Sequence, residues 1–275
     1  MDYGNLKNIM GSGESTEFMP LLFVGHGSPM NAIEENEFVL SWRNLGKTLL
    51  RPKAILCISA HWETSGTYVT AMPKPPTIHD FGGFPNALYE VQYPAPGSPD
   101  LASGIKQAIT AANVGLDLKW GLDHGSWSVI RNMYPEADIP VVELSLDWHR
   151  TPQDHYDLAK ELVKLREKGV LIIGSGNIVH NLRMLAWAHA DEPEYGFDWA
   201  VSANNLFKRL ILEKNHKELI GYSILGKDVS LAVPTPDHYI PLLYILALMK
   251  EKESVSFFND KTIMGSLSMT SLLIR

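Results

Sequence analysis

The chain has 275 residues, of which 45% are hydrophobic, so it can bury a large core within one domain. Its formal charge of −7 at neutral pH argues against a nucleic-acid partner, because phosphate binding requires an excess of Lys and Arg. No apolar run approaches the length that spans a bilayer, and the N-terminus lacks the basic and apolar regions of a signal peptide, so we expect no membrane partner.

The predicted elements alternate between strands and helices after a polar, irregular arm at residues 1–18. In chain order we expect strand 20–24, helix 36–49, strands 54–59 and 68–71, helices 99–112 and 126–133, strand 140–146, helix 152–166, strand 170–173, a helix that follows residue 177 and ends near 190, helices 199–213 and 239–249, and strands 255–258 and 267–274. Residues 214–233 carry no pattern that we can assign. The alternation predicts a single α/β domain at residues 19–275, with a mostly parallel or mixed central sheet flanked by helices.

Two histidines follow the first two predicted strands. His26 lies between glycines directly after strand 20–24, and His61 comes just after strand 54–59. Because the carboxyl ends of parallel strands meet at one edge of a sheet, we expect these two imidazoles to share one small volume. The alternative for each residue alone is a turn histidine without a ligand role.

A third histidine follows the buried run 170–173. Two glycines allow a tight turn there, and Asn177 is expected to cap the next helix, which places His180 near the same edge of the sheet. The alternative is one more helix histidine.

Two further histidines and a long loop stand in similar settings. Asp123 precedes His124 and could orient its imidazole, and His238 lies in a proline-rich turn at the start of helix 239–249. The loop at 72–99 is rich in proline, glycine and aromatic residues, which favours a wall or lid for a flat, apolar ligand. A surface loop stiffened by proline is the alternative.

Several common motifs are absent from the sequence. It has no phosphate loop, dinucleotide fingerprint, nucleophile elbow, Cys-x-x-Cys or His-Glu-x-x-His. The single cysteine, Cys57, cannot form an internal disulfide, which favours a reducing cytoplasm. The remaining chemistry lies in the histidines. Neutral imidazoles suit zinc and iron, and three of them with an open position are typical of a catalytic metal site at the strand edge.

Six motifs carry a resemblance to a known family: Gly25-His26-Gly27-Ser28-Pro29-Met30, Ser59-Ala60-His61-Trp62, His79-Asp80-Phe81-Gly82-Gly83-Phe84-Pro85, Asp123-His124-Gly125-Ser126-Trp127, Gly176-Asn177-Ile178-Val179-His180-Asn181 and Pro234-Thr235-Pro236-Asp237-His238-Tyr239. Over residues 20–275 the chain resembles the 4,5-DOPA extradiol dioxygenases, in their bacterial branch. That family belongs to the class III extradiol ring-cleaving dioxygenases.

The resemblance implies one divalent metal held by His26, His61 and His238. It also implies that His180 is the acid/base residue, near enough to the metal to be a fourth ligand. In the wider class the third ligand is usually a carboxylate, whereas the matching position here is His238, with Asp237 beside it. Ferrous iron is expected for activity and zinc in the protein as purified.

The resemblance further implies a catechol substrate, such as DOPA, opened with O2 by 4,5-cleavage to a seco-DOPA semialdehyde. His124 would be catalytic and would bind substrate together with Asp123 and Trp62. A zinc-dependent hydrolase and a non-enzymatic binding protein on the same fold are the alternatives.

Overall fold

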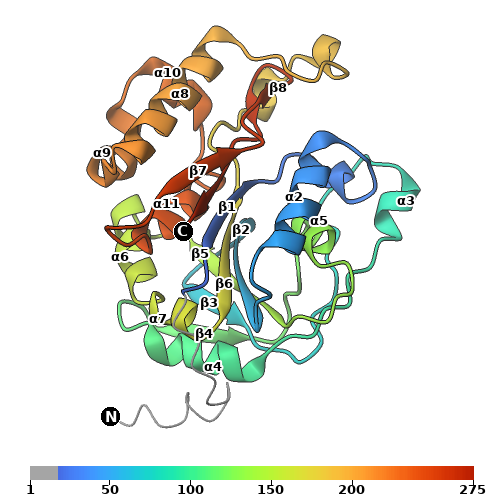
Figure 1. Cartoon of the computed structure of the whole chain (residues 1–275), viewed down its shortest axis with the longest axis vertical. Coiled ribbons are helices and arrows are strands. Elements are labelled where there is room, and N and C mark those ends of the chain that lie inside the picture. The colour runs from blue at the N-terminus through green and yellow to red at the C-terminus, as the bar shows by residue number, and fades with distance from the viewer. Residues whose placement is uncertain (1–17) are drawn as a thin grey trace.

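A mixed eight-stranded sheet lies at the centre of the structure, a computed structural model that describes residues 18–275 (Figure 1). Its strand order is β4-β3-β5-β2-β6-β1-β10-β7. The strands are β1 (Leu21–Gly25), β2 (Ala54–Thr64), β3 (Thr67–Thr70), β4 (Val114–Asp117), β5 (Val141–Asp147), β6 (Val170–Gly176), β7 (Val255–Phe258) and β10 (Ser271–Ile274), and a separate ribbon pairs β8 (Thr262–Ile263) with β9 (Leu267–Ser268). Apart from Phe18, the predicted arm at 1–18 lies outside the described residues.

The four central strands are parallel and the edges are mixed. β1 pairs with β6, β6 with β2, and β2 with β5, all in parallel. At one edge β10 runs antiparallel to β1 and β7 antiparallel to β10, whereas at the other β3 is antiparallel to β5. Strands β1, β5 and β6 are buried along their whole length, as expected for strands covered on both faces. The predicted single α/β domain with a parallel or mixed sheet is therefore confirmed.

Helices cover both faces of the sheet. They are α2 (Glu37–Thr48), α3 (Asn86–Tyr89), α4 (Pro99–Ala108), α5 (His124–Met133), α6 (Pro152–Lys160), α7 (Lys164–Glu167), α8 (Asp198–Leu212), α9 (His216–Ile220), α10 (Lys227–Ala232) and α11 (Ile240–Ala247), with 3-10 turns η1 (Pro29–Ala32), η2 (Leu182–Met184), η3 (Trp187–His189) and η4 (Tyr222–Ile224).

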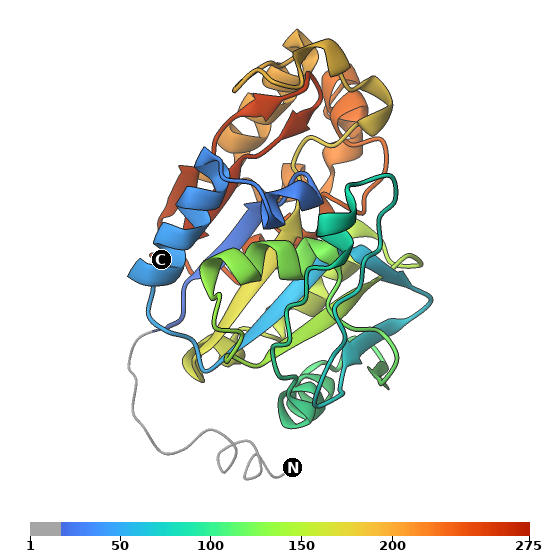
Figure 2. The ribbon, with the colours of Figure 1, turned by 90° about the vertical axis from the view of Figure 1, so that its right-hand side faces the viewer.

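The alternation of side chains along β1 assigns each helix to a face. Leu22 packs in one cluster with Trp42 of α2 and Trp127 of α5, and these two helices lie side by side in Figure 2. Phe23 packs in the other cluster, with residues of α4, α6, α8 and α11. Within the described residues, no helix is both long and apolar enough to cross a membrane.

The structure corrects three local predictions and adds elements that the sequence did not indicate. No helix follows residue 177: Asn177 donates its side-chain amide to the Ser268 carbonyl, and only the short turns η2 and η3 occur before residue 190. His61 lies within β2 rather than after it. The predicted helix 152–166 is interrupted between α6 and α7. Strand β4 and the helices at 216–232 had no recognised sequence pattern.

Candidate metal centre and active site

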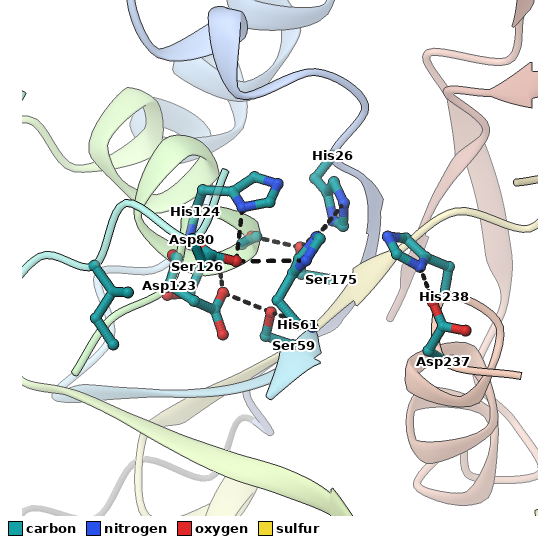
Figure 3. Close-up of polar contacts among 12 residues, drawn as sticks. His26, Ser59, His61, Asp80, Asp123, His124, Ser126, Ser175, Asp237 and His238 are labelled. Atoms are coloured by element: carbon teal, nitrogen blue, oxygen red, sulfur yellow. Dashed lines mark hydrogen bonds and ion pairs between the residues drawn. The ribbon is translucent and has the colours of Figure 1, made fainter. Parts of the chain in front are cut away.

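Three imidazoles from distant parts of the chain meet beyond the carboxyl ends of β1 and β6. His26 follows β1, His61 lies near the end of β2, and His238 precedes α11. Their ring centroids are 4.9 Å apart for His26 and His61, 5.2 Å for His26 and His238, and 4.9 Å for His61 and His238. Figure 3 shows the ring of His238 turned toward the other two.

The local glycines make this approach possible. At Gly176, the last residue of β6, a Cβ atom would lie 2.2 Å from the carbonyl oxygen of His238. The backbone amide of Asn177 donates to the same carbonyl at 3.0 Å, and the backbone amide of His26 donates to the Gly176 carbonyl at 3.1 Å. Thus the end of β6 lies directly between the segments that carry two of the histidines.

The hydrogen bonds of His26 fix which ring nitrogen carries its proton. Nδ1 of His26 is 2.9 Å from the hydroxyl of Ser175, and that hydroxyl donates its single hydrogen to the carbonyl of Gly125. Toward His26 the hydroxyl can therefore only accept. The proton of a neutral His26 lies on Nδ1, and Nε2 presents a lone pair.

His61 and His238 present the same nitrogen. Nδ1 of His61 is 3.5 Å from a carboxylate oxygen of Asp80, and Nδ1 of His238 contacts the carboxylate of Asp237. A carboxylate only accepts, so Nδ1 of His238 donates to Asp237 and Nε2 of His238 carries a lone pair, and the carboxylate beside Nδ1 of His61 favours the same tautomer in that ring. Nε2 of His238 is buried and has no hydrogen-bond partner among the described residues.

These lone pairs fit a metal cation. The Nε2 atoms of His26 and His61 are 3.1 Å apart, so two lone pairs face each other at a distance that favours a cation between them. Zinc accepts imidazole nitrogens at about 2.0–2.1 Å, which both atoms can supply to one ion. The donor set of three neutral imidazole nitrogens also suits iron.

Burial keeps these imidazoles neutral. Desolvation, followed by the neighbouring His61, lowers the pKa of His26 well below its ordinary value. Burial and His124 lower the pKa of His61 to about 3, and burial and His180 lower the pKa of His238 strongly. Metal binding requires deprotonated ligands, so these neutral imidazoles can bind a metal at neutral pH without first losing a proton.

His124 and His180 flank this group on two sides. Nitrogen atoms of His26, His61 and His124 lie within 4.8 Å of one another, and the ligand atoms of His180, Asp237 and His238 form a second group of the same size. The ring of His180 stacks on that of His238, with centroids 3.5 Å apart and planes 9° apart. Burial is the main cause that lowers the pKa of His180 to about 4.

The carboxylate that holds His124 is Asp80 rather than Asp123. Asp80 Oδ2 lies 2.9 Å from Nδ1 of His124, and Oδ1 accepts from the backbone amide of His124. Asp123 instead caps α5 and accepts from the hydroxyl of Ser59 at 2.6 Å. The expected orientation of His124 by its sequence neighbour is therefore wrong, because the helix cap turns Asp123 inward. Asp80 belongs to the motif at 79–85, but nothing in the sequence of this loop indicates that its partner is His124.

A buried carboxyl pair lies beneath the histidines. Glu143 of β5 accepts from the backbone amide of Asp123 at 3.0 Å, from the hydroxyl of Ser126 and from the indole of Trp120. Burial and the charge of Asp123 raise the pKa of Glu143 well above its ordinary value. Trp62, predicted to bind substrate, is buried and stacks on Trp120, with ring centroids 5.8 Å apart.

Comparisons with known proteins agree with this geometry. A family model described as the catalytic LigB subunit of aromatic ring-opening dioxygenase matches residues 20–268. The chain is 47% identical to the 4,5-DOPA dioxygenase extradiol of Escherichia coli (strain K12), covering 94% of this chain and 96% of that protein. It is 35% identical to the 4,5-DOPA dioxygenase extradiol of Beta vulgaris, covering 94% and 97% of the two chains.

A solved structure from Escherichia coli K12, described as that of an uncharacterized protein, shares the fold with a TM-score of 0.81 and 41% identity. The match covers 94% of this chain and 100% of the chain in that structure. Enzymes of the matched family use a divalent metal, and the histidine cluster is consistent with one. The chain therefore belongs to the class III extradiol dioxygenases and is an oxidoreductase that cleaves aromatic rings.

Proposed function

We propose that the domain at 19–275 opens a catechol such as DOPA by 4,5-cleavage, at a metal held by His26, His61 and His238. The observation that carries the ligand assignment is the convergence of three imidazoles whose Nε2 atoms present lone pairs. The names of the two relatives support DOPA as the substrate. Ferrous iron at this position would bind the catechol and O2 and pass electrons between them, which zinc cannot do because its filled shell is redox-inert.

His180 is proposed as the proton-transfer residue rather than a ligand. A ligating imidazole directs its lone pair along the ring plane, and the planes of His180 and His238 are parallel at 3.5 Å. His26, His61 and His238 would therefore hold the ion, and the lone pairs of the stacked His180 ring would not point to the same position as Nε2 of His238. The stacked ring remains beside the reacting groups, where a neutral imidazole can accept a proton and return it.

His124 is proposed to form the opposite wall of the substrate pocket. Its ring lies 3.9 Å from that of His61, and Phe81 from the loop at 72–99 packs edge-on against it at 5.5 Å. We propose that Asp123 and Trp62 support this wall from within the core, because both are buried.

Anaerobic loading with ferrous iron, followed by DOPA and then O2, tests the proposal. We expect one metal per chain, stoichiometric O2 uptake and a yellow semialdehyde product whose mass and NMR spectrum correspond to 4,5-cleavage. Protein loaded with zinc alone should consume no O2. Full oxygen uptake by iron-free zinc protein would overturn the iron assignment, and a different ring-opened product would overturn the proposed position of cleavage.

Substitution of each proposed ligand tests the site itself. His26→Ala, His61→Ala and His238→Ala should each sharply reduce metal retained after dialysis, whereas the exposed His149→Ala should not. Full metal occupancy in all three folded variants would contradict the assignment.

A further inference from the structure

Asp80 reaches two imidazoles with a single carboxylate. Its Oδ2 lies 2.9 Å from Nδ1 of His124 and 3.5 Å from Nδ1 of His61. Dashed lines in Figure 3 mark both contacts. Its Oδ1 accepts from the backbone amide of His124 at 2.9 Å. The side chain is 15% exposed, so water competes little for these contacts.

The loop that delivers Asp80 is fixed on both sides of it. The backbone amide of Ile78 donates to Leu122 at 2.8 Å, and the indole of Trp127 donates to the carbonyl of Ile78 at 2.8 Å. His79 bonds the carbonyl of Val91 at 3.0 Å. Asp80 is thus held against the start of α5 by its neighbours, and its position does not depend on its own contacts alone.

The carboxylate determines the tautomer of both rings. Oδ1 of Asp80 accepts the backbone amide hydrogen of His124 and Oδ2 faces Nδ1 of the same residue at 2.9 Å, so the carboxylate acts as an acceptor toward His124 through both oxygens. A carboxylate accepts and does not donate, so Nδ1 of His124 carries a hydrogen, and the same oxygen 3.5 Å from Nδ1 of His61 favours a hydrogen there too. Both rings then present Nε2 as a lone pair.

We propose that Asp80 is a positioning residue that couples the metal ligand His61 to the pocket histidine His124. Through one oxygen it orients the ligand lone pair toward the metal and the lone pair of His124 toward the catechol. The inference rests on the proposed function, in which His61 binds metal and His124 lines the substrate pocket. Partners of this kind beside a ligating histidine typically change metal affinity or activity by 10- to 100-fold when removed.

The plain structural alternative is that Asp80 only caps α5. Asp80→Asn separates the two roles, because the asparagine oxygen can still accept from the amide of His124 while its NH2 group cannot accept from either Nδ1 atom. The control for loss of one carboxylate charge is Asp138→Asn, which removes an exposed ion pair with Arg51.

The first measurement is metal affinity, by competition with a chelator, together with steady-state kinetics. For Asp80→Asn we expect metal binding weakened by about 10- to 100-fold, a lower kcat at saturating metal and a higher KM for catechol. The thermal unfolding midpoint of the metal-free protein and all parameters of Asp138→Asn should stay near those of the wild type. Wild-type metal affinity in a folded Asp80→Asn protein would overturn the proposal.

The second measurement requires neither metal nor a folded variant. In metal-free wild-type protein, 15N–1H spectra that correlate ring nitrogens with ring protons should report hydrogen on Nδ1 for both His61 and His124. Hydrogen on Nε2 of either ring would overturn the proposal. Failure of wild-type protein to bind metal or consume O2 would instead count against the proposed function, so the two failures are distinguishable.

Discussion

At the scale of single residues, the two stacked imidazoles at the site differ in their contacts, and we propose different roles for them. His238 has its Nδ1 against Asp237 and a buried Nε2 without a partner, whereas His180 lies over its face with a parallel ring. Stacking on His238 holds the ring of His180 in place, and under the proposed function its side chain can be changed without loss of the metal.

His180→Gln should therefore retain metal and bind catechol but turn over about a hundred- to ten-thousand-fold more slowly, the usual contribution of a positioned acid/base group. Metal analysis and single-turnover rates on the same folded sample measure both effects. A metal-depleted His180→Gln protein would favour the ligand role, and near-normal turnover would favour mere packing.

The residue scale also shows what the sequence could predict. His26 and His61 follow strongly apolar runs, so their meeting at one edge could be predicted from the expectation that both strands run parallel in one sheet. Asp80 could not be assigned, because its partner His124 lies on a different element and only the folded loop brings them together. Because Asp123 precedes His124 in the sequence, it could be expected to orient that imidazole, but its side chain instead caps α5.

At the scale of elements, the segment after β6 shows why one helix prediction failed. The glycines and Asn177 resemble a strand-to-helix turn, yet the backbone amide of His180 donates to Ala232 and that of Asn181 donates to Ser266. Tertiary partners take the amides that a first helical turn would leave free. Neither partner is near in sequence, so no local pattern could reveal them.

At Gly176, a single added methyl group would disturb the contact between the end of β6 and the segment that carries His238. Gly176→Ala places a Cβ atom 2.2 Å from the backbone of His238, which must move because a carbonyl cannot rotate away as a side chain does. We expect a lower unfolding midpoint and weaker metal binding. Gly221→Ala is the matched control, since its Cβ atom meets Lys217 at an ordinary 3.4 Å. Equal metal affinity in the two variants would contradict the prediction.

At the scale of the whole molecule, Arg166 joins three parts of the fold. It is fully buried, donates to the carbonyl of Met19 before β1 and to that of Leu248 after α11, and pairs with Glu253 before β7. Arg166→Leu leaves Glu253 without its charge partner and should cost about 3–5 kcal/mol of stability.

Chemical denaturation of the metal-free protein measures this loss. The exposed pair of Arg51 and Asp138 is the control, and Arg51→Leu should cost about 0–1 kcal/mol. The double variant Arg166→Leu/Glu253→Leu should recover part of the loss. A loss for Arg166→Leu no greater than that for Arg51→Leu would refute the assigned role.

His155 gives stability a dependence on pH. It is 3% exposed, lies 3.0 Å from the hydroxyl of Tyr244, and burial is the main cause that lowers its pKa from 6.5 to about 4. Between pH 6.5 and 4 the unfolded chain binds a proton that the folded chain does not, so the free energy of unfolding falls as pH falls through this window. The difference is worth about 3 kcal/mol in total.

Denaturation curves at several pH values between 7.5 and 4 should show a smaller decline for His155→Gln than for the wild type. The exposed His149→Gln should keep the wild-type slope. An unchanged slope in His155→Gln would show that other groups account for the acid sensitivity.

The position of β1 in the sheet has a consequence for biosynthesis. The first strand of the described chain pairs only with β6 and β10, and the amide of Gly25 bonds the hydroxyl of Ser271, 246 positions later. At ribosomal rates of about 5–20 residues per second, that interval lasts on the order of ten to fifty seconds. During this time β1 lacks its neighbour β10, and for most of it the segment that carries His238 has not yet been synthesised. A metal held by both His26 and His238, as proposed, would therefore bind only after the segment that carries His238 has left the ribosome.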